Sequence, residues 1–112
     1  MLSVESLKSF GANTEEGLGR CFNNEAFYLR LVGMGLADAN FDRLKAAMEA
    51  RDTRAAFEAA YALKGSIGNL ALTPIYEPIC ALTEKLRGQE DPGDAGGLLD
   101  EILSRLEEAR AL

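Results

Sequence analysis

The residues best suited to chemistry in this chain lie within the segment 60–70, which reads AYALKGSIGNL. Four of them share one face of a helix, because positions three, four and seven residues apart lie on the same side. They are Tyr61, Lys64, Gly65 and Gly68. A glycine inside a helix costs about 1 kcal/mol relative to alanine, so two glycines require a compensating gain. A bare backbone beside a lysine and an aromatic ring predicts close approach by an anionic partner.

The neighbours of this face allow more than one interpretation. Ser66 is turned off the open face and has no nearby His or Cys to activate it, so we expect it to bond to a backbone carbonyl. Asn69 is expected to form a local hydrogen bond. Phe57 lies one turn before Tyr61, and we prefer packing beneath the N-terminal helices to an aromatic patch with Tyr61 at a protein interface.

The segment 64–70, KGSIGNL, resembles the signature helix of histidine-containing phosphotransfer (HPt) domains. In that family a phosphorylatable histidine lies three residues before the lysine. Here that position is Tyr61, and the chain contains no histidine. The resemblance implies a degenerate HPt domain in which Lys64 faces the phosphate site. It also implies that the small residues Gly65 and Gly68 let a response-regulator receiver domain approach.

The loss of the histidine changes the function that the resemblance implies. Phosphoryl transfer depends on positioning and charge stabilisation, but a relay also needs a nucleophile that forms a labile phosphoramidate. The leading hypothesis is a module of a two-component phosphorelay that is not an enzyme. It binds a response-regulator receiver or a hybrid sensor kinase as a scaffold or sequestering module. The expected partner-binding residues are Phe57, Tyr61, Lys64, Gly65, Gly68 and Asn69.

Two alternatives remain open. The first is a helical bundle repurposed as an interaction domain for an unrelated protein partner. The second is a true phosphotransfer enzyme that uses Tyr61 or Ser66 as its nucleophile.

Composition excludes several classes of function. The 112 residues predict one domain, and the net charge of -6 without a Lys/Arg cluster argues against binding to nucleic acid or an anionic membrane. Without histidine or a CxxC pair, no zinc site and no cofactor are expected. Cys21 and Cys80 are expected to be buried free thiols in a reducing cytosol. The chain shows no signal-peptide pattern and no bilayer-length apolar run, which predicts a cytoplasmic location.

Helix signals recur along the whole chain, and no useful length of sequence alternates as a strand would. The expected helices cover about 3–10, 14–22, 25–39, 41–50, 54–71, a segment from Thr73 to before Gly88, and 97–111. With short connections, they predict an all-α, antiparallel up-down-up-down four-helix bundle with short N-terminal helices, which the HPt resemblance also implies.

Particular residues are expected at the helix ends and in the core. Capping is predicted at Asn13, Asn40, Asp52 or Thr53, and Thr73. The stripe Phe27, Leu31, Met34 and Ala39 is predicted to face the core, widened by Tyr28, Val32 and Leu36. In the signature helix, the core stripe is Ala56, Ala59, Leu63, Ile67 and Leu70.

Overall fold

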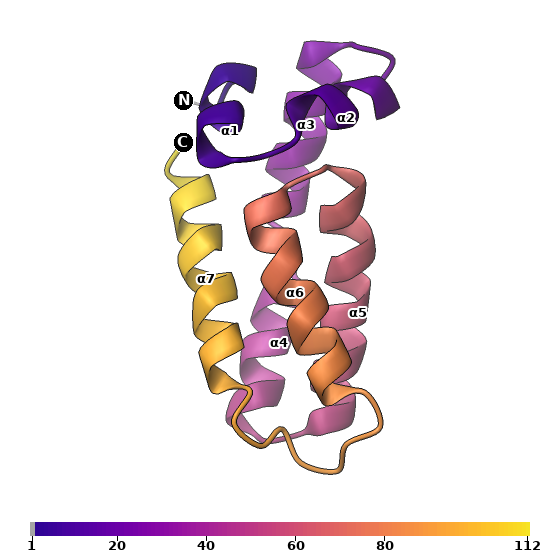
Figure 1. The fold of residues 1–112 in the computed structure, drawn as a ribbon, viewed down its shortest axis with the longest axis vertical. Coiled ribbons are helices and arrows are strands. Elements are labelled where there is room, and N and C mark those ends of the chain that lie inside the picture. Colours follow the sequence, from indigo (N-terminus) through magenta and orange to yellow (C-terminus); the bar gives the residue numbers. More distant parts are fainter. Residues whose placement is uncertain (1) are drawn as a thin grey trace.

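The structure is a computed structural model that describes residues 2–112, which form helices and connecting segments without any strand (Figure 1). The helices are α1 (Val4–Phe10), α2 (Thr14–Arg20), α3 (Glu25–Leu36), α4 (Asn40–Glu49), α5 (Thr53–Asn69), α6 (Thr73–Leu86) and α7 (Gly96–Arg110). The all-α class predicted from the sequence is confirmed.

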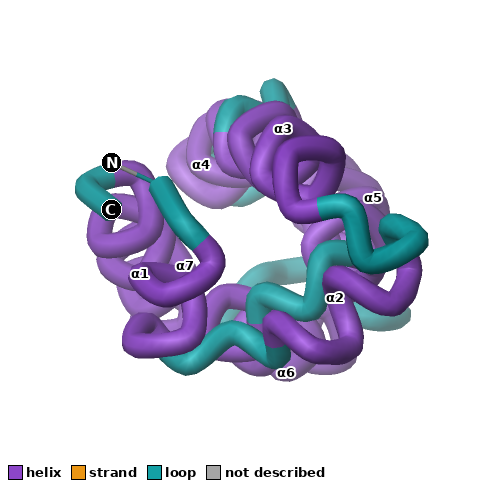
Figure 2. The backbone as a smooth tube through the Cα atoms, turned by 90° about the horizontal axis from the view of Figure 1, so that it is seen from above, coloured by secondary structure: helices purple, strands orange, loops and turns teal. Residues whose placement is uncertain are grey.

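Helices α4, α5, α6 and α7 lie side by side along the longest axis of a molecule that measures 43 × 23 × 19 Å (Figure 1). Helix α5 lies between α4 and α6 and packs along both, and α6 also packs along α7. Seen from above, α3 lies over α4, and α1 and α2 lie at the same end as α3 (Figure 2). The turn between α5 and α6 is at this end too, so α2 lies close to the last turn of α5 (Figure 1).

The apolar stripe of α5 forms part of the core, as its helical spacing predicted. Leu63 and Ile67 are fully buried, and they pack in one cluster with Ile79 of α6 and Ile102 of α7. Burying a side chain of this size contributes about 1.5–3 kcal/mol. The opposite side of α5 is therefore the side left for a functional surface.

Only part of the stripe predicted for α3 faces the core. Tyr28, Val32 and Leu36 are buried as predicted, and Phe27 and Leu31 pack against the core half-buried. Met34 is 65% exposed instead, and Ala39 lies beyond the end of α3 and is exposed. The hydroxyl of Tyr28 donates a hydrogen bond to the Leu70 carbonyl at 2.9 Å, and burial raises the pKa of this phenol. A buried hydroxyl needs such a partner, so this bond favours the Tyr28 face over the Met34 face.

Two of the predicted helix starts are also wrong. Helix α4 begins at Asn40 without a side-chain cap; instead, the Asn40 N–H donates to Asp38 Oδ1 at 2.8 Å. The carboxylate of Asp38 thus forms the local bond that Asn40 was expected to supply. Thr73 is the first residue of α6, and its N-cap position is Leu72.

Two other helix starts follow their predicted residues. Asn13 Oδ1 accepts the Glu16 N–H at 3.2 Å, and Asp52 Oδ1 accepts the Ala55 N–H at 3.1 Å. Gly11 ends α1 with a φ of 112°, a left-handed conformation that glycine adopts without strain.

The chain leaves α2 earlier than expected. The helix ends at Arg20, and Phe22 and Asn23 follow with φ angles of 58° and 57°, which cannot continue a right-handed helix. Both cysteines are free, and Cys21 is buried as predicted, but Cys80 is only half-buried. None of the helices described in residues 2–112 is long and apolar enough to cross a membrane.

Candidate functional site

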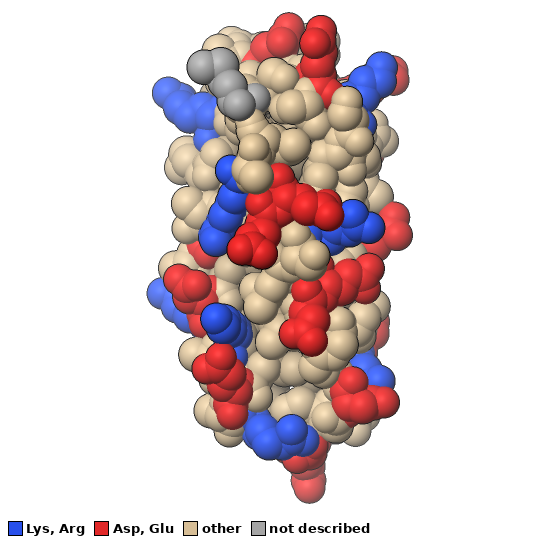
Figure 3. All heavy atoms as spheres, turned by 90° about the vertical axis from the view of Figure 1, so that its left-hand side faces the viewer, with Lys and Arg blue, Asp and Glu red and all other residues tan. Residues whose placement is uncertain are grey.

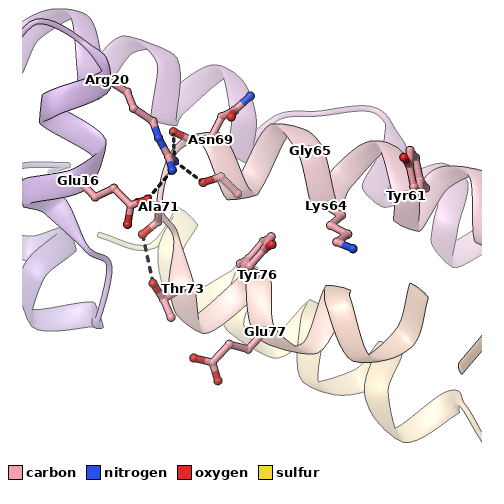
Figure 4. A pocket seen from close by; sticks show the side chains of 11 residues that line it. Glu16, Arg20, Tyr61, Lys64, Gly65, Asn69, Ala71, Thr73, Tyr76 and Glu77 are labelled. Atoms are coloured by element: carbon pink, nitrogen blue, oxygen red, sulfur yellow. Dashed lines mark hydrogen bonds and ion pairs between the residues drawn. The ribbon is translucent and has the colours of Figure 1, made fainter. Parts of the chain in front are cut away.

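A groove of about 590 Å³ runs along the outer side of α5, where this helix faces α6 and the end of α2 (Figure 4). Five of the six residues predicted for partner binding line this groove. They are Tyr61, Lys64, Gly65, Gly68 and Asn69. Phe57 is not among the lining residues.

The middle of the α5 wall is open. A Cβ added at Gly65 would have no neighbouring atom within 4 Å, and Tyr61 is 57% exposed. The Lys64 side chain extends from α5 toward α6, between Tyr61 and Tyr76 (Figure 4). Within residues 2–112, no carboxylate lies within ion-pair distance of this ammonium group. This part of the wall combines a bare backbone, a phenol ring and an unpaired positive charge.

The backbone at Gly68 is not bare, contrary to the expectation from the sequence. A Cβ at this position would lie 2.7 Å from Cε1 of Tyr76, which is closer than two carbon atoms that are not bonded to each other approach. The missing side chain makes room for the ring of Tyr76, which packs from α6 onto α5. Gly68 therefore serves contact between two helices of this chain.

The last turn of α5 is held by Arg20 of α2 (Figure 4). Its Nη1 donates to the carbonyls of Gly68 at 2.7 Å and Asn69 at 3.0 Å, while Nη2 pairs with the Glu16 carboxylate. Carbonyls at a helix C-terminus lack partners within the helix, and a cation there offsets the helix dipole. Asn69 takes part through its carbonyl, and no hydrogen bond of its side chain is found within the described residues.

Tyr76 forms much of the α6 wall. Interaction with the Cys80 thiol is the main reason that the pKa of Tyr76 lies above its ordinary value, with a smaller contribution from burial. The phenol is therefore protonated at neutral pH and presents a neutral hydroxyl to the groove.

Phe57 forms an aromatic pair with Tyr61 and does not pack beneath the N-terminal helices. The two ring centroids are 5.9 Å apart, and the guanidinium carbon of Arg87 lies 5.2 Å from the centroid of Phe57. The N-terminal helices lie at the other end of α5, far from its first turns (Figure 1). Phe57 thus supports the ring of Tyr61 from just beyond the groove.

Ser66 lies outside the groove. Its hydroxyl is 3.4 Å from the Leu63 carbonyl, as predicted, and 3.3 Å from Oδ2 of Asp38, a neighbour that the sequence did not indicate. The hydroxyl therefore joins α5 to the segment between α3 and α4.

The side of the molecule that α7 forms is different in character. Acidic and basic side chains alternate over its whole length (Figure 3). Arg105 and Glu108 form an ion pair there at 3.1 Å, and such exposed pairs contribute about 0–1 kcal/mol. This is an ordinary solvated surface.

The residues of the groove that belong to other helices were not found by sequence reasoning. Glu16 and Arg20 are four positions apart, which suggests an ion pair, but nothing local indicates that Arg20 reaches a carbonyl 48 residues away. Tyr76 and Glu77 of α6 carry no motif. Among the residues that the structure describes, no cluster of three or more His, Cys, Asp or Glu could hold a metal ion.

Comparison with known proteins gave no relative of this chain: no family model, no curated protein and no solved structure matches it. The function is therefore argued from the groove and its residues.

Proposed function

We propose that this chain is an HPt-like module of a two-component phosphorelay, which docks a receiver domain through the α5 groove without accepting a phosphoryl group. The receiver belongs to a response regulator or a hybrid sensor kinase, and the module acts in the cytoplasm as a scaffold or sequestering partner. The long helices then form an antiparallel up-down-up-down four-helix bundle, with α1 and α2 as its short N-terminal helices.

One observation carries this proposal. Tyr61, Lys64 and Gly65 lie on the solvent side of α5, and no atom covers the backbone at Gly65. A helix gains nothing in stability from an uncovered interior glycine, since alanine would be better by about 1 kcal/mol. Gly19 and Gly33 are equally uncovered, but only Gly65 among these three lines the groove beside Tyr61 and Lys64, and this setting favours close approach by another protein here.

The same groove argues against catalysis by phosphoryl transfer. Lys64 supplies charge stabilisation, but Tyr61 takes the position of the nucleophile, and the chain has no histidine to replace it. The hydroxyl of Ser66 is hydrogen-bonded away from the groove. Binding without transfer is the function that these residues support.

Titration with receiver domains from the same cell, phosphorylated and unphosphorylated, tests the proposal. We expect saturable binding by at least one receiver, with the backbone amide signals of Gly65 and Lys64 shifted in an NMR spectrum. Absence of binding by every receiver at any practical concentration would contradict the proposal.

A gain-of-function variant tests the missing nucleophile. Tyr61→His places an imidazole beside Lys64 and the open backbone of Gly65, so the variant should take radiolabelled phosphate from a phosphorylated receiver. The parent chain and Tyr61→Phe should take none. Label on the parent would show that it is a phosphotransfer enzyme, and a folded Tyr61→His that no receiver labels would count against the docking site.

An unrelated partner remains the second candidate, because large apolar side chains are also exposed away from the groove. Phe22 is 90% and Met34 is 65% exposed. If this candidate is correct, Lys64→Glu will leave the native association intact, and Phe22→Ser or Met34→Ser will abolish it.

A further inference from the structure

The groove has a second wall, which comes from the first turns of α6. Tyr76 and Glu77 both line this wall; the ring of Tyr76 points toward α5, whereas the side chain of Glu77 extends away from α5 at the rim (Figure 4). The ring of Tyr76 packs against Gly68, where a Cβ would lie only 2.7 Å from it. This contact brings the two walls together at the end of α5, so a partner that enters the groove meets side chains of both helices.

Four charged side chains line the groove, and two of them already have partners. Arg20 is bound to the carbonyls at the end of α5 and to Glu16. Lys64 on one wall and Glu77 on the other have no oppositely charged partner within 4 Å among residues 2–112. Within this distance the groove therefore has one positive and one negative charge without an ion-pair partner, although Lys64 also contributes, at longer range, to the lowered pKa of Glu84.

The sum of these charges distinguishes the groove from the rest of the molecule. Glu16, Arg20, Lys64 and Glu77 together are formally neutral, whereas the whole chain carries a net charge of -6. A protein surface that carries both signs can match both walls at once.

We infer that Glu77 is a specificity-determining residue of the docking groove, and that the partner presents an acidic side chain to Lys64 and a basic side chain to Glu77. The inference rests on the proposed function, which makes this partner a receiver domain. Complementary charges of this kind select partners and steer association, while like charges placed opposite each other are unfavourable.

Charge reversal at Glu77 tests the inference with the receivers that bind the parent chain. Glu77→Lys should raise the dissociation constant about tenfold at low salt, and by less at high salt, where charges are screened. Glu101→Lys on α7 is the matched control, because Glu101 is also exposed and the overall charge changes equally. This control should bind like the parent, and circular dichroism should show both variants folded.

The outcomes show whether the inference alone fails or whether the proposed function fails with it. If Glu77→Lys binds as well as or better than the parent while Lys64→Glu abolishes binding, the partner presents an anion alone; the inference then fails and the docking function stands. If no receiver binds the parent, both fail. Inorganic phosphate serves as the free-anion probe, and we expect no shift of the Gly65 amide signal; a saturable shift would also overturn the two-charge inference.

Discussion

Gly65 and Gly68 lie one turn apart on α5, yet their surroundings differ completely. A Cβ at Gly65 would meet nothing within 4 Å, whereas a Cβ at Gly68 would lie 2.7 Å from the ring of Tyr76. The first glycine leaves its backbone open to solvent, and the second lets α6 pack onto α5. The comparison teaches that two glycines on one helical face can differ in kind, and that the neighbouring helices decide whether the space of the missing side chain is filled.

Helix α2 repeats this contrast. A Cβ at Gly17 would lie 2.5 Å from Cε1 of Tyr28, whereas a Cβ at Gly19 would meet nothing within 4 Å. Tyr28 is fully buried, and its hydroxyl is bonded to the Leu70 carbonyl, so this ring cannot move aside as easily as the half-buried Tyr76. Alanine substitutions at these glycines should therefore change the free energy of unfolding by different amounts, and these differences test the comparison.

The largest effect is expected for Gly17→Ala. The added methyl group overlaps a buried ring, so the free energy of unfolding should fall by about 3 kcal/mol, measured by urea denaturation. Gly19→Ala in the same helix is the control, and it should stabilise the chain by about 0.5–1 kcal/mol. Equal stability of the two variants would contradict the distinction between glycines whose Cβ position is occupied by a neighbouring ring and glycines whose Cβ position is empty.

A smaller loss is expected for Gly68→Ala. The methyl group meets the ring of Tyr76, which can shift in part, so we expect a loss of about 1 kcal/mol. In a Tyr76→Ala background the same substitution should be stabilising, because the ring is gone and helix propensity dominates. A double-mutant cycle measures this coupling, and additive effects would show that Tyr76 is not the reason for the glycine.

Gly65→Ala should have the opposite sign. With no atom near the added methyl group, the free energy of unfolding should rise by about 1 kcal/mol, in line with the helix propensities of the two residues. Thermal unfolding followed by circular dichroism is a sufficient measurement. A destabilised variant would mean that the backbone at Gly65 is covered.

The smallest effect is expected at the other end of the molecule, in the loop between α6 and α7. The Gly93 N–H and the guanidinium of Arg51 hold the pKa of Asp91 below its ordinary value, so this stabilisation is present above about pH 3.9 and is lost as the pH falls through the folded-state pKa. Asp91→Asn should slightly lower the urea midpoint at pH 7, and this difference should shrink as the pH falls below about 3.9. A difference that persists at low pH would contradict this account.

Local patterns in the sequence predicted what lies within a few turns of one helix. The core stripe of α5 and the caps at Asn13 and Asp52 follow from spacing and residue type. Spacing could not predict which stripe of α3 is buried most deeply, because the Phe27 and Tyr28 stripes both have helical spacing and both contact the core. The bond from Tyr28 to Leu70, which is 42 residues away, separates them.

The candidate site likewise contains residues that the sequence predicted and residues that only the folded structure places there. Tyr61, Lys64 and Gly65 were predicted to lie together because they belong to one helical face. Arg20 and Tyr76 reach α5 only through the folded arrangement of α2 and α6, and no local pattern places them there. The sequence could thus indicate the α5 wall of the groove. The α6 wall, with Tyr76, and the end near Arg20 of α2 depend on tertiary packing.

Receiver binding by Gly65→Arg tests the central claim most directly. The arginine fills the open part of the groove without touching the core. Gly33→Arg on α3 is the matched control, since Gly33 is also exposed, helical and without neighbours within 4 Å. We predict that the parent and Gly33→Arg bind the same receiver with equal dissociation constants, and that Gly65→Arg binds at least about a hundredfold more weakly. Equal binding by all three chains would contradict the assignment of this groove as the docking site.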